Sequence, residues 1–154
     1  MGLESANYFI SVKDGWARLD EVLLRLGAER RDAFAPGLDR WIIRGDRYWI
    51  DLMSGEFGGG ETPGISVRVA LCNPPDVEIA VRHVLAALMN EFNGQLYDVQ
   101  TSQSYRALDD ASWAQVQEAF AAKRAQFRQY FGSFEAAMSG EDVFPRLDEL
   151  RRMN

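Results

Sequence analysis

Few residues in this sequence could act as a nucleophile, a strong base or a metal ligand. The chain of 154 residues contains one cysteine, Cys72, and one histidine, His83. Cys72 ends an apolar run, where a cysteine is usually a small buried hydrophobic residue. His83 lies at the border of an apolar helical stripe. Because a zinc site needs several converging histidine, cysteine or carboxylate ligands, we expect no metal site.

Carboxylates are the remaining candidates for acid–base chemistry. They are Asp51, Glu78, Glu91 and Asp98, and no two of them have a spacing typical of a catalytic pair. A nucleophile, a base and an oxyanion donor cannot be assembled from these residues. We therefore expect no catalytic residue and no cofactor, and an enzyme that uses carboxylates alone is the last of the alternatives.

The glycine-rich segment 54–64, SGEFGGGETPG, invites comparison with phosphate-binding loops. Such loops place glycine amides beside a helix N-terminus and usually continue with Lys and Ser or Thr. Here Glu56 and Glu61 flank three consecutive glycines, no lysine follows, and the next element is expected to be a strand. The segment is therefore expected to be an irregular connection whose carboxylates could contact a basic partner.

Aromatic residues next to carboxylates form a second feature. Trp41, Tyr48 and Trp49 lie close in sequence to Asp46 and Asp51. Aromatic anchors with a charged rim are typical of protein interfaces. We expect Tyr48 in the core, whereas Trp49 could be either a core or a contact residue.

Composition narrows the class of partner and the compartment. The formal net charge of -6 and the pI of about 4.8 argue against binding to nucleic acid and suit solubility or attraction to a basic partner. No apolar stretch approaches the length of a membrane span, and the N-terminus does not resemble a signal peptide. A single cysteine excludes an intrachain disulfide. These features predict a cytoplasmic protein that binds neither nucleic acid nor membrane.

Periodicity predicts a single α+β domain over residues 1–154. We expect strands at 7–13, 41–44, 47–53, 65–72 and 95–105, and helices at 16–26, 76–93 and 109–131, followed by short helical patches. The polar later half of 95–105 could instead be an edge or a loop. If 41–53 is one long bent strand and not a hairpin, the core is a ferredoxin-like β-α-β-β-α-β unit with added C-terminal helices. The sheet would be antiparallel or mixed, with helices packed on one face.

The short α+β core, the acidic excess, the opening strand YFISVK and the acidic glycine segment together resemble bacterial polymorphic-toxin immunity proteins of the contact-dependent growth-inhibition type. The resemblance implies a stoichiometric inhibitor, or antitoxin, that binds a cognate toxin domain, often a basic nuclease, and occludes its active site. Carboxylates would then occupy the groove that normally receives phosphates. The expected contact residues are Asp46, Trp49, Asp51, Glu56, Phe57, Glu61 and Asp98.

An alternative keeps the same fold and changes the function. A ferredoxin-like small-molecule-binding or regulatory module would form a homodimer through its sheet and hold its ligand between sheet and helices. Stabilisation by a metabolite is expected from this alternative alone.

Overall fold

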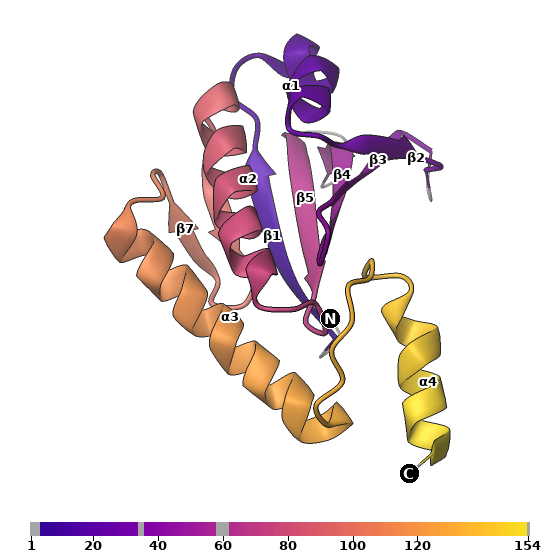
Figure 1. Cartoon of the computed structure of the whole chain (residues 1–154). Coiled ribbons are helices and arrows are strands. Elements are labelled where there is room, and N and C mark those ends of the chain that lie inside the picture. The colour runs from indigo at the N-terminus through magenta and orange to yellow at the C-terminus, as the bar shows by residue number, and fades with distance from the viewer. Residues whose placement is uncertain (1–3, 34–35, 58–61, 154) are drawn as a thin grey trace.

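The described residues form one antiparallel sheet of seven strands with helices around it (Figure 1). This computed structural model describes residues 4–33, 36–57 and 62–153. The strands lie in the order β2-β3-β4-β5-β1-β6-β7. They are β1 (Ser5–Ser11), β2 (Glu29–Arg31), β3 (Leu38–Arg44), β4 (Trp49–Phe57), β5 (Thr62–Ala70), β6 (Leu96–Asp98) and β7 (Gln103–Tyr105). The helices are η1 (Trp16–Arg18), α1 (Leu19–Arg25), α2 (Asp76–Phe92), α3 (Asp110–Phe131) and α4 (Val143–Met153).

This architecture confirms the α+β class and an antiparallel sheet. It does not confirm the four-stranded ferredoxin-like unit, because the sheet has seven strands in the described part of the chain. The segment 41–53 is a true hairpin: β3 and β4 pair from Leu38 opposite Gly55 to Arg44 opposite Trp49. The predicted single strand at 95–105 is also two strands, β6 and β7, with Asp98 opposite Gln103.

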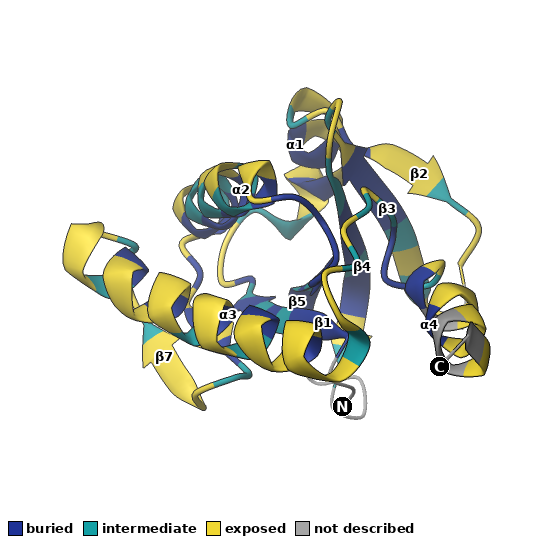
Figure 2. Ribbon diagram, turned by 60° about the horizontal axis from the view of Figure 1, so that its bottom comes forward, coloured by how far each residue is buried: buried dark blue, intermediate teal, exposed yellow. Residues whose placement is uncertain are grey.

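One face of the sheet is apolar and is covered by helices. Successive side chains of a strand point to opposite faces, and Tyr8, Ile10, Val67 and Val69 alternate toward this covered face with almost no exposure. Figure 2 shows the buried residues of α2 and α3 turned toward the interior. The two helices are joined by an ion pair between Arg124 and Glu78, whose side-chain atoms are 3.5 Å apart.

The helix ends follow capping rules visible in the sequence. The side chain of Asp109 accepts a hydrogen bond of 2.8 Å from the Ser112 N–H at the start of α3, and Gly132 ends that helix with a φ of 76°. Asn93 adopts a left-handed conformation directly after α2. These terminators explain why the predicted bounds of both long helices agree with the structure.

The glycine-rich segment was expected to be irregular, and much of it is strand. Ser54–Phe57 belongs to β4 and residues 62–64 belong to β5, whereas residues 58–61 lie outside the described residues. The glycines here permit close packing. A Cβ on Gly64 would lie 2.2 Å from the ring of Phe9, and one on Gly55 would lie 2.6 Å from the carbonyl oxygen of Gly37. Because glycine has no side chain, Phe9 and the Gly37 carbonyl can lie close to the strand backbone at these two positions.

After α3 the chain passes from the covered face to the other face of the sheet. The Ala136 N–H donates a 2.8 Å hydrogen bond to the Cys72 carbonyl in the connection between β5 and α2. The segment 138–142, here called the C-terminal bend, then reaches strands β3 and β4, and α4 follows it (Figure 1). The expectation of helices on one face therefore holds for α2 and α3, while the bend contributes to the opposite side.

Candidate functional site

The second face of the sheet carries the candidate site, and we call it the open face. Its register is set by strand pairing: Phe9 lies opposite both Ser66 and Tyr97, and Asp51 lies opposite Arg68. Partners opposite each other in an antiparallel pair point to the same side. The open face therefore presents an aromatic region over β1, β6 and the end of β4, and a charged region over β3, β4 and β5.

The aromatic region, which we call the aromatic shelf, consists of Phe9, Phe57 and Tyr97. The rings of Phe9 and Phe57 are 5.3 Å apart at an interplanar angle of 83°, an edge-to-face contact. Phe9 and Phe57 are half-buried, and Tyr97 is 38% exposed. Together with Asn7, Ser66 and Val99 they line a shallow hollow of about 450 Å³. Among the residues that the structure describes, this lining contains no charged side chain.

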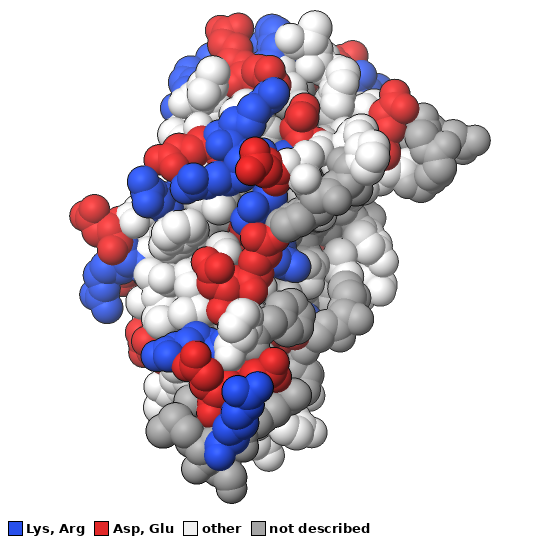
Figure 3. Space-filling model, turned by 90° about the vertical axis from the view of Figure 1, so that its right-hand side faces the viewer, with Lys and Arg blue, Asp and Glu red and all other residues white. Residues whose placement is uncertain are grey.

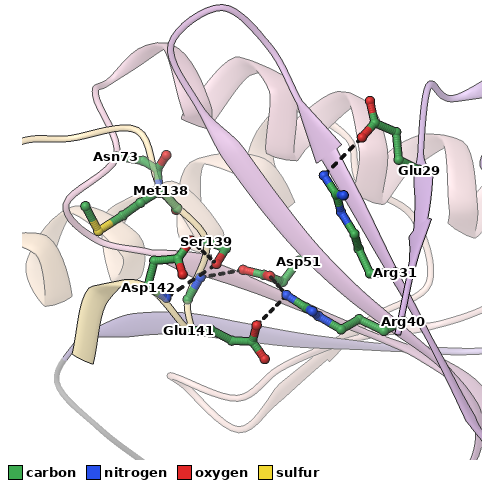
Figure 4. Close-up of polar contacts among 10 residues, drawn as sticks. Glu29, Arg31, Arg40, Asp51, Asn73, Met138, Ser139, Glu141 and Asp142 are labelled. Atoms are coloured by element: carbon green, nitrogen blue, oxygen red, sulfur yellow. Dashed lines mark hydrogen bonds and ion pairs between the residues drawn. The ribbon is translucent and has the colours of Figure 1, made fainter. Parts of the chain in front are cut away.

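The charged region is a hollow of about 410 Å³ between the sheet and the C-terminal bend, and we call it the charged hollow. Its lining consists of Arg40, Asp51, Leu52, Met53, Ser66, Arg68 and Glu141. Figure 4 shows Arg40 reaching from the sheet toward Asp51 and Glu141. Glu141 lies 2.5 Å from the Arg40 guanidinium, while the nearest oxygen of Asp51 lies 3.8 Å from it.

Asp51 is the buried centre of the charged hollow, with 7% of its surface exposed. Its Oδ2 accepts a 2.6 Å hydrogen bond from the Gly140 N–H, and its Oδ1 has no hydrogen-bond partner. Burial raises the pKa of this carboxyl, although the Gly140 N–H and the guanidiniums of Arg68 and Arg40 act in the opposite direction. Asp51 therefore anchors the C-terminal bend and retains one unsatisfied acceptor.

The bend is fixed to the rest of the molecule by Asn73, which is fully buried. The Asn73 side chain donates 2.9 Å hydrogen bonds to the carbonyls of Ala70 and Met138 and accepts one of 2.9 Å from the Trp49 N–H. Its own carbonyl accepts from Arg124 of α3 at 2.9 Å. One side chain thus joins β4, the β5–α2 connection and the C-terminal bend.

The structure does not gather the predicted contact carboxylates into one patch. Asp46 is exposed in the turn between β3 and β4. Glu56 is exposed near the other end of β4, about 23 Å from Trp49, where the strand begins, at the usual rise per strand residue. Asp51 is buried between them. Glu61 lies outside the described residues.

The prediction that Asp98 is a surface contact residue is wrong. It lies opposite Tyr8 and is fully buried on the covered face, where its Oδ1 accepts from the backbone and the side chain of Gln100 at 2.9 and 2.7 Å. Burial raises its pKa. The polar sequence that follows Asp98 suggested exposure, but the turn after β6 folds back so that Gln100 donates to Oδ1, while Oδ2 is buried without a hydrogen-bond partner.

The predicted apolar anchors lie apart. Phe57 belongs to the aromatic shelf, whereas Trp49 is half-buried at the far end of β4, with the Arg44 guanidinium 5.6 Å from its ring centroid. Figure 3 shows acidic and basic side chains interspersed over the side of the molecule that it presents. The arrangement indicates a mixed-charge surface and not a field of negative charge on that side.

Neither Cys72 nor His83, the one cysteine and the one histidine of the sequence, lines the charged hollow or the aromatic shelf. Cys72 is 1% exposed, and burial raises the pKa of its thiol to about 11. His83 is exposed on α2. Within residues 4–33, 36–57 and 62–153, no three histidine, cysteine or carboxylate side chains are grouped so that they could hold a metal ion.

Sequence reasoning missed most residues of the open face. Phe9 occupies the polar phase of an alternating strand, between Asn7 and Ser11, and a large aromatic residue at such a position is a signal that could have been used. Arg40, Glu141 and Gly140 carry no such signal, because 100 or more positions separate Arg40 from Gly140 and Glu141 and only the folded chain brings them together.

Comparisons of the chain with protein-family models, with curated proteins and with solved structures found no match. Across the described helices, none has the length and apolar character that crossing a membrane requires.

Proposed function

We propose that this chain is a cytoplasmic immunity protein that binds a cognate toxin domain, most simply a basic nuclease, and occludes its active site. The single observation that carries the proposal is the aromatic shelf, an uncharged patch of Phe9, Phe57 and Tyr97 on a sheet face that α2 and α3 leave uncovered. Aromatic side chains are the commonest anchors of protein interfaces.

The charge of the whole molecule supports a basic partner. A net charge of -6 attracts a positively charged domain over long distances and accelerates its association. Glu56 precedes Phe57 on β4 and is exposed, but successive strand side chains alternate, so its carboxylate points away from the face that carries the aromatic shelf. The proposed mechanism uses apolar anchoring with charge steering, because Asp51 and Asp98 are buried and cannot mimic phosphates at the surface.

The proposal includes a finer description of the fold. Strands β4, β5, β1 and β6 are consecutive in the sheet, α1 falls between β1 and β4 in the chain, and α2 falls between β5 and β6. We propose that these elements are the split β-α-β-β-α-β unit, to which β2, β3 and β7 are additions. This scaffold positions both regions of the open face.

The experiment is a binding titration between the purified chain and the toxin domain encoded next to its gene. We expect an equimolar complex and loss of toxin activity. Tyr97→Ala should weaken binding by about 2 kcal/mol, as for an interface anchor. The matched control is Tyr130→Ala, which removes a tyrosine that is 67% exposed on α3. Absence of a complex, or equal losses in the two variants, would contradict the proposal.

A further inference from the structure

The charged hollow has a buried unsatisfied acceptor next to a partly exposed arginine. Asp51 Oδ1 has no hydrogen-bond partner although the residue is 7% exposed. Arg68, opposite Asp51 on β5, is only partly buried, and among the described residues it makes no hydrogen bond and has no carboxylate oxygen within 4.0 Å, although its charge acts on Asp51. Buried polar groups are normally satisfied, so Asp51 Oδ1 lacks a donor that an additional molecule could supply, and the partly exposed Arg68 guanidinium beside it can bind a carboxylate.

The positions of the Arg68 and Asp51 side chains are both fixed by contacts with Gly140 in the C-terminal bend. The Arg68 guanidinium lies against the backbone of Gly140, where an added Cβ would be 2.2 Å from its Nε. Asp51 is held from the same bend by the Gly140 N–H. Both side chains are therefore positioned before a ligand arrives, which reduces the entropy cost of binding.

The balance of charge selects the class of ligand. Two guanidiniums, of Arg40 and Arg68, face two carboxylates, of Asp51 and Glu141. A simple anion would meet the carboxylates, and a simple cation would meet the guanidiniums. A neutral molecule with an acidic and a basic group on neighbouring atoms can satisfy both sides.

We propose that the charged hollow binds a small zwitterion of the α-amino-acid class, with its carboxylate on Arg68 and its ammonium group donating to Asp51 Oδ1. The half-buried Met53 lies opposite Ser66 and offers an apolar surface to the ligand side chain. The volume of about 410 Å³ lies within the range of roughly 300–1,000 Å³ that is usual for small-molecule sites.

This site supports the alternative of a small-molecule-binding module, with a different location from the one expected. The sequence suggested a pocket between sheet and helices, whereas the charged hollow lies between the open face and the C-terminal bend. The inference does not rest on toxin binding, which uses the aromatic shelf.

The test uses the full chain and L-leucine, L-methionine and glycine as probes, each up to 10 mM, followed by thermal unfolding and by amide NMR. L-Leucine or L-methionine should raise the Tm and shift the Gly140 amide resonance. The matched controls are 4-methylpentanoate, which lacks the ammonium group of leucine, and 3-methylbutylamine, which lacks its carboxylate. Neither control should raise the Tm.

Two substitutions locate the site. Arg68→Met should weaken binding at least tenfold. Asp51→Asn should do the same, because its amide oxygen can still accept from Gly140 while its NH2 group then faces the ligand ammonium. Arg47→Met, at an arginine that is exposed at the β3–β4 turn, should leave binding unchanged.

The outcomes are decisive in either direction. The proposal is overturned if neither L-leucine nor L-methionine changes the Tm or the Gly140 resonance, if a single-charge control binds equally well, or if Arg68→Met retains affinity. Should a variant fail to fold, the NMR map of the unsubstituted chain still decides, because shifts must centre on Arg68, Ser66 and Gly140.

Discussion

The covered face and the open face are built from alternate residues of the same strands, yet different parts of the chain complete them. On the covered face, Tyr8, Ile10 and Val67 pack against the apolar stripes of α2 and α3. On the open face, a short bend far along the chain attaches to Asp51 and Arg40 by polar contacts, and the aromatic shelf beside it remains accessible.

We infer that the covered face mainly determines the stability of the fold, whereas the open face mainly determines what the protein binds. Apolar burial stabilises the covered face with little dependence on the direction of each contact. The open face depends on a few directional hydrogen bonds, so small changes there should alter the surface without unfolding the protein. The following predictions test that division.

The largest effect is expected from the core of the covered face. Phe92 is fully buried on α2, so Phe92→Ala should lower the free energy of unfolding by about 3–5 kcal/mol. Phe57→Ala, its counterpart on the open face, should cost only about 1 kcal/mol, because its ring is half-buried and loses one edge-to-face contact. Urea unfolding of both variants measures the difference; equal losses would break the division.

Loss of the connector between the faces should follow in size. Asn73→Ala leaves the Trp49 N–H and the carbonyls of Ala70 and Met138 without their partner, at a cost of about 3 kcal/mol. Asn90→Ala, at an exposed position of α2, is the matched control and should be nearly neutral. Urea unfolding gives both values, and hydrogen exchange should show the bend opening in Asn73→Ala alone.

A smaller effect is expected from crowding at the C-terminal bend. Gly140→Ala places a methyl group where the Arg68 guanidinium lies, so it should cost about 1–3 kcal/mol. In an Arg68→Ala background the same substitution should cost clearly less, because the obstructing group has been removed. A double-mutant cycle measured by urea unfolding yields this coupling, and an identical cost in both backgrounds would contradict the contact.

The smallest effect concerns the pH dependence contributed by Asp98. Burial raises its pKa above 3.8 in the folded protein, so the folded state holds this proton more tightly than the unfolded chain does. The stability that the carboxyl contributes is therefore present below pH 3.8 and is lost as the pH rises through the folded-state pKa. Asp98→Asn stays neutral and can keep both Gln100 hydrogen bonds, so we expect it to gain relative stability as the pH rises.

Urea unfolding from pH 4 to pH 7 checks this prediction, with Asp46→Asn at the exposed turn as the control. A stability difference between Asp98→Asn and the unsubstituted chain that stays constant with pH would show that the buried carboxyl does not contribute as expected. A difference that falls with pH would reverse the assigned sign.

Sequence patterns predicted the covered face well and the open face poorly. The spacing of apolar residues in α2 and the Asp109 cap of α3 are local signals, so the helices were found nearly to the residue. β2 was missed because its three residues, Glu-Arg-Arg, carry no apolar alternation. The surface role expected for Asp98 failed because its partner, Gln100, is supplied by a turn that the sequence did not reveal.

The site was predictable only in part for the same reason. Phe57 was among the expected contact residues, whereas Phe9 was counted only as a strand residue. Arg40 and Glu141 are 101 positions apart, and no periodic pattern links them. Contacts between distant parts of a chain arise from the tertiary fold, which local periodicity does not encode.

The short outer strands have a consequence for behaviour at high concentration. β2 and β7 each contain three residues, mostly exposed and polar or charged. If a strand from another molecule paired with β2 or β7, it would form few main-chain hydrogen bonds. It would also lie beside charged or hydroxyl-bearing side chains. These short edge strands therefore disfavour fibril growth by strand addition. The sheet can expose aromatic rings on one face without aggregating through its edges.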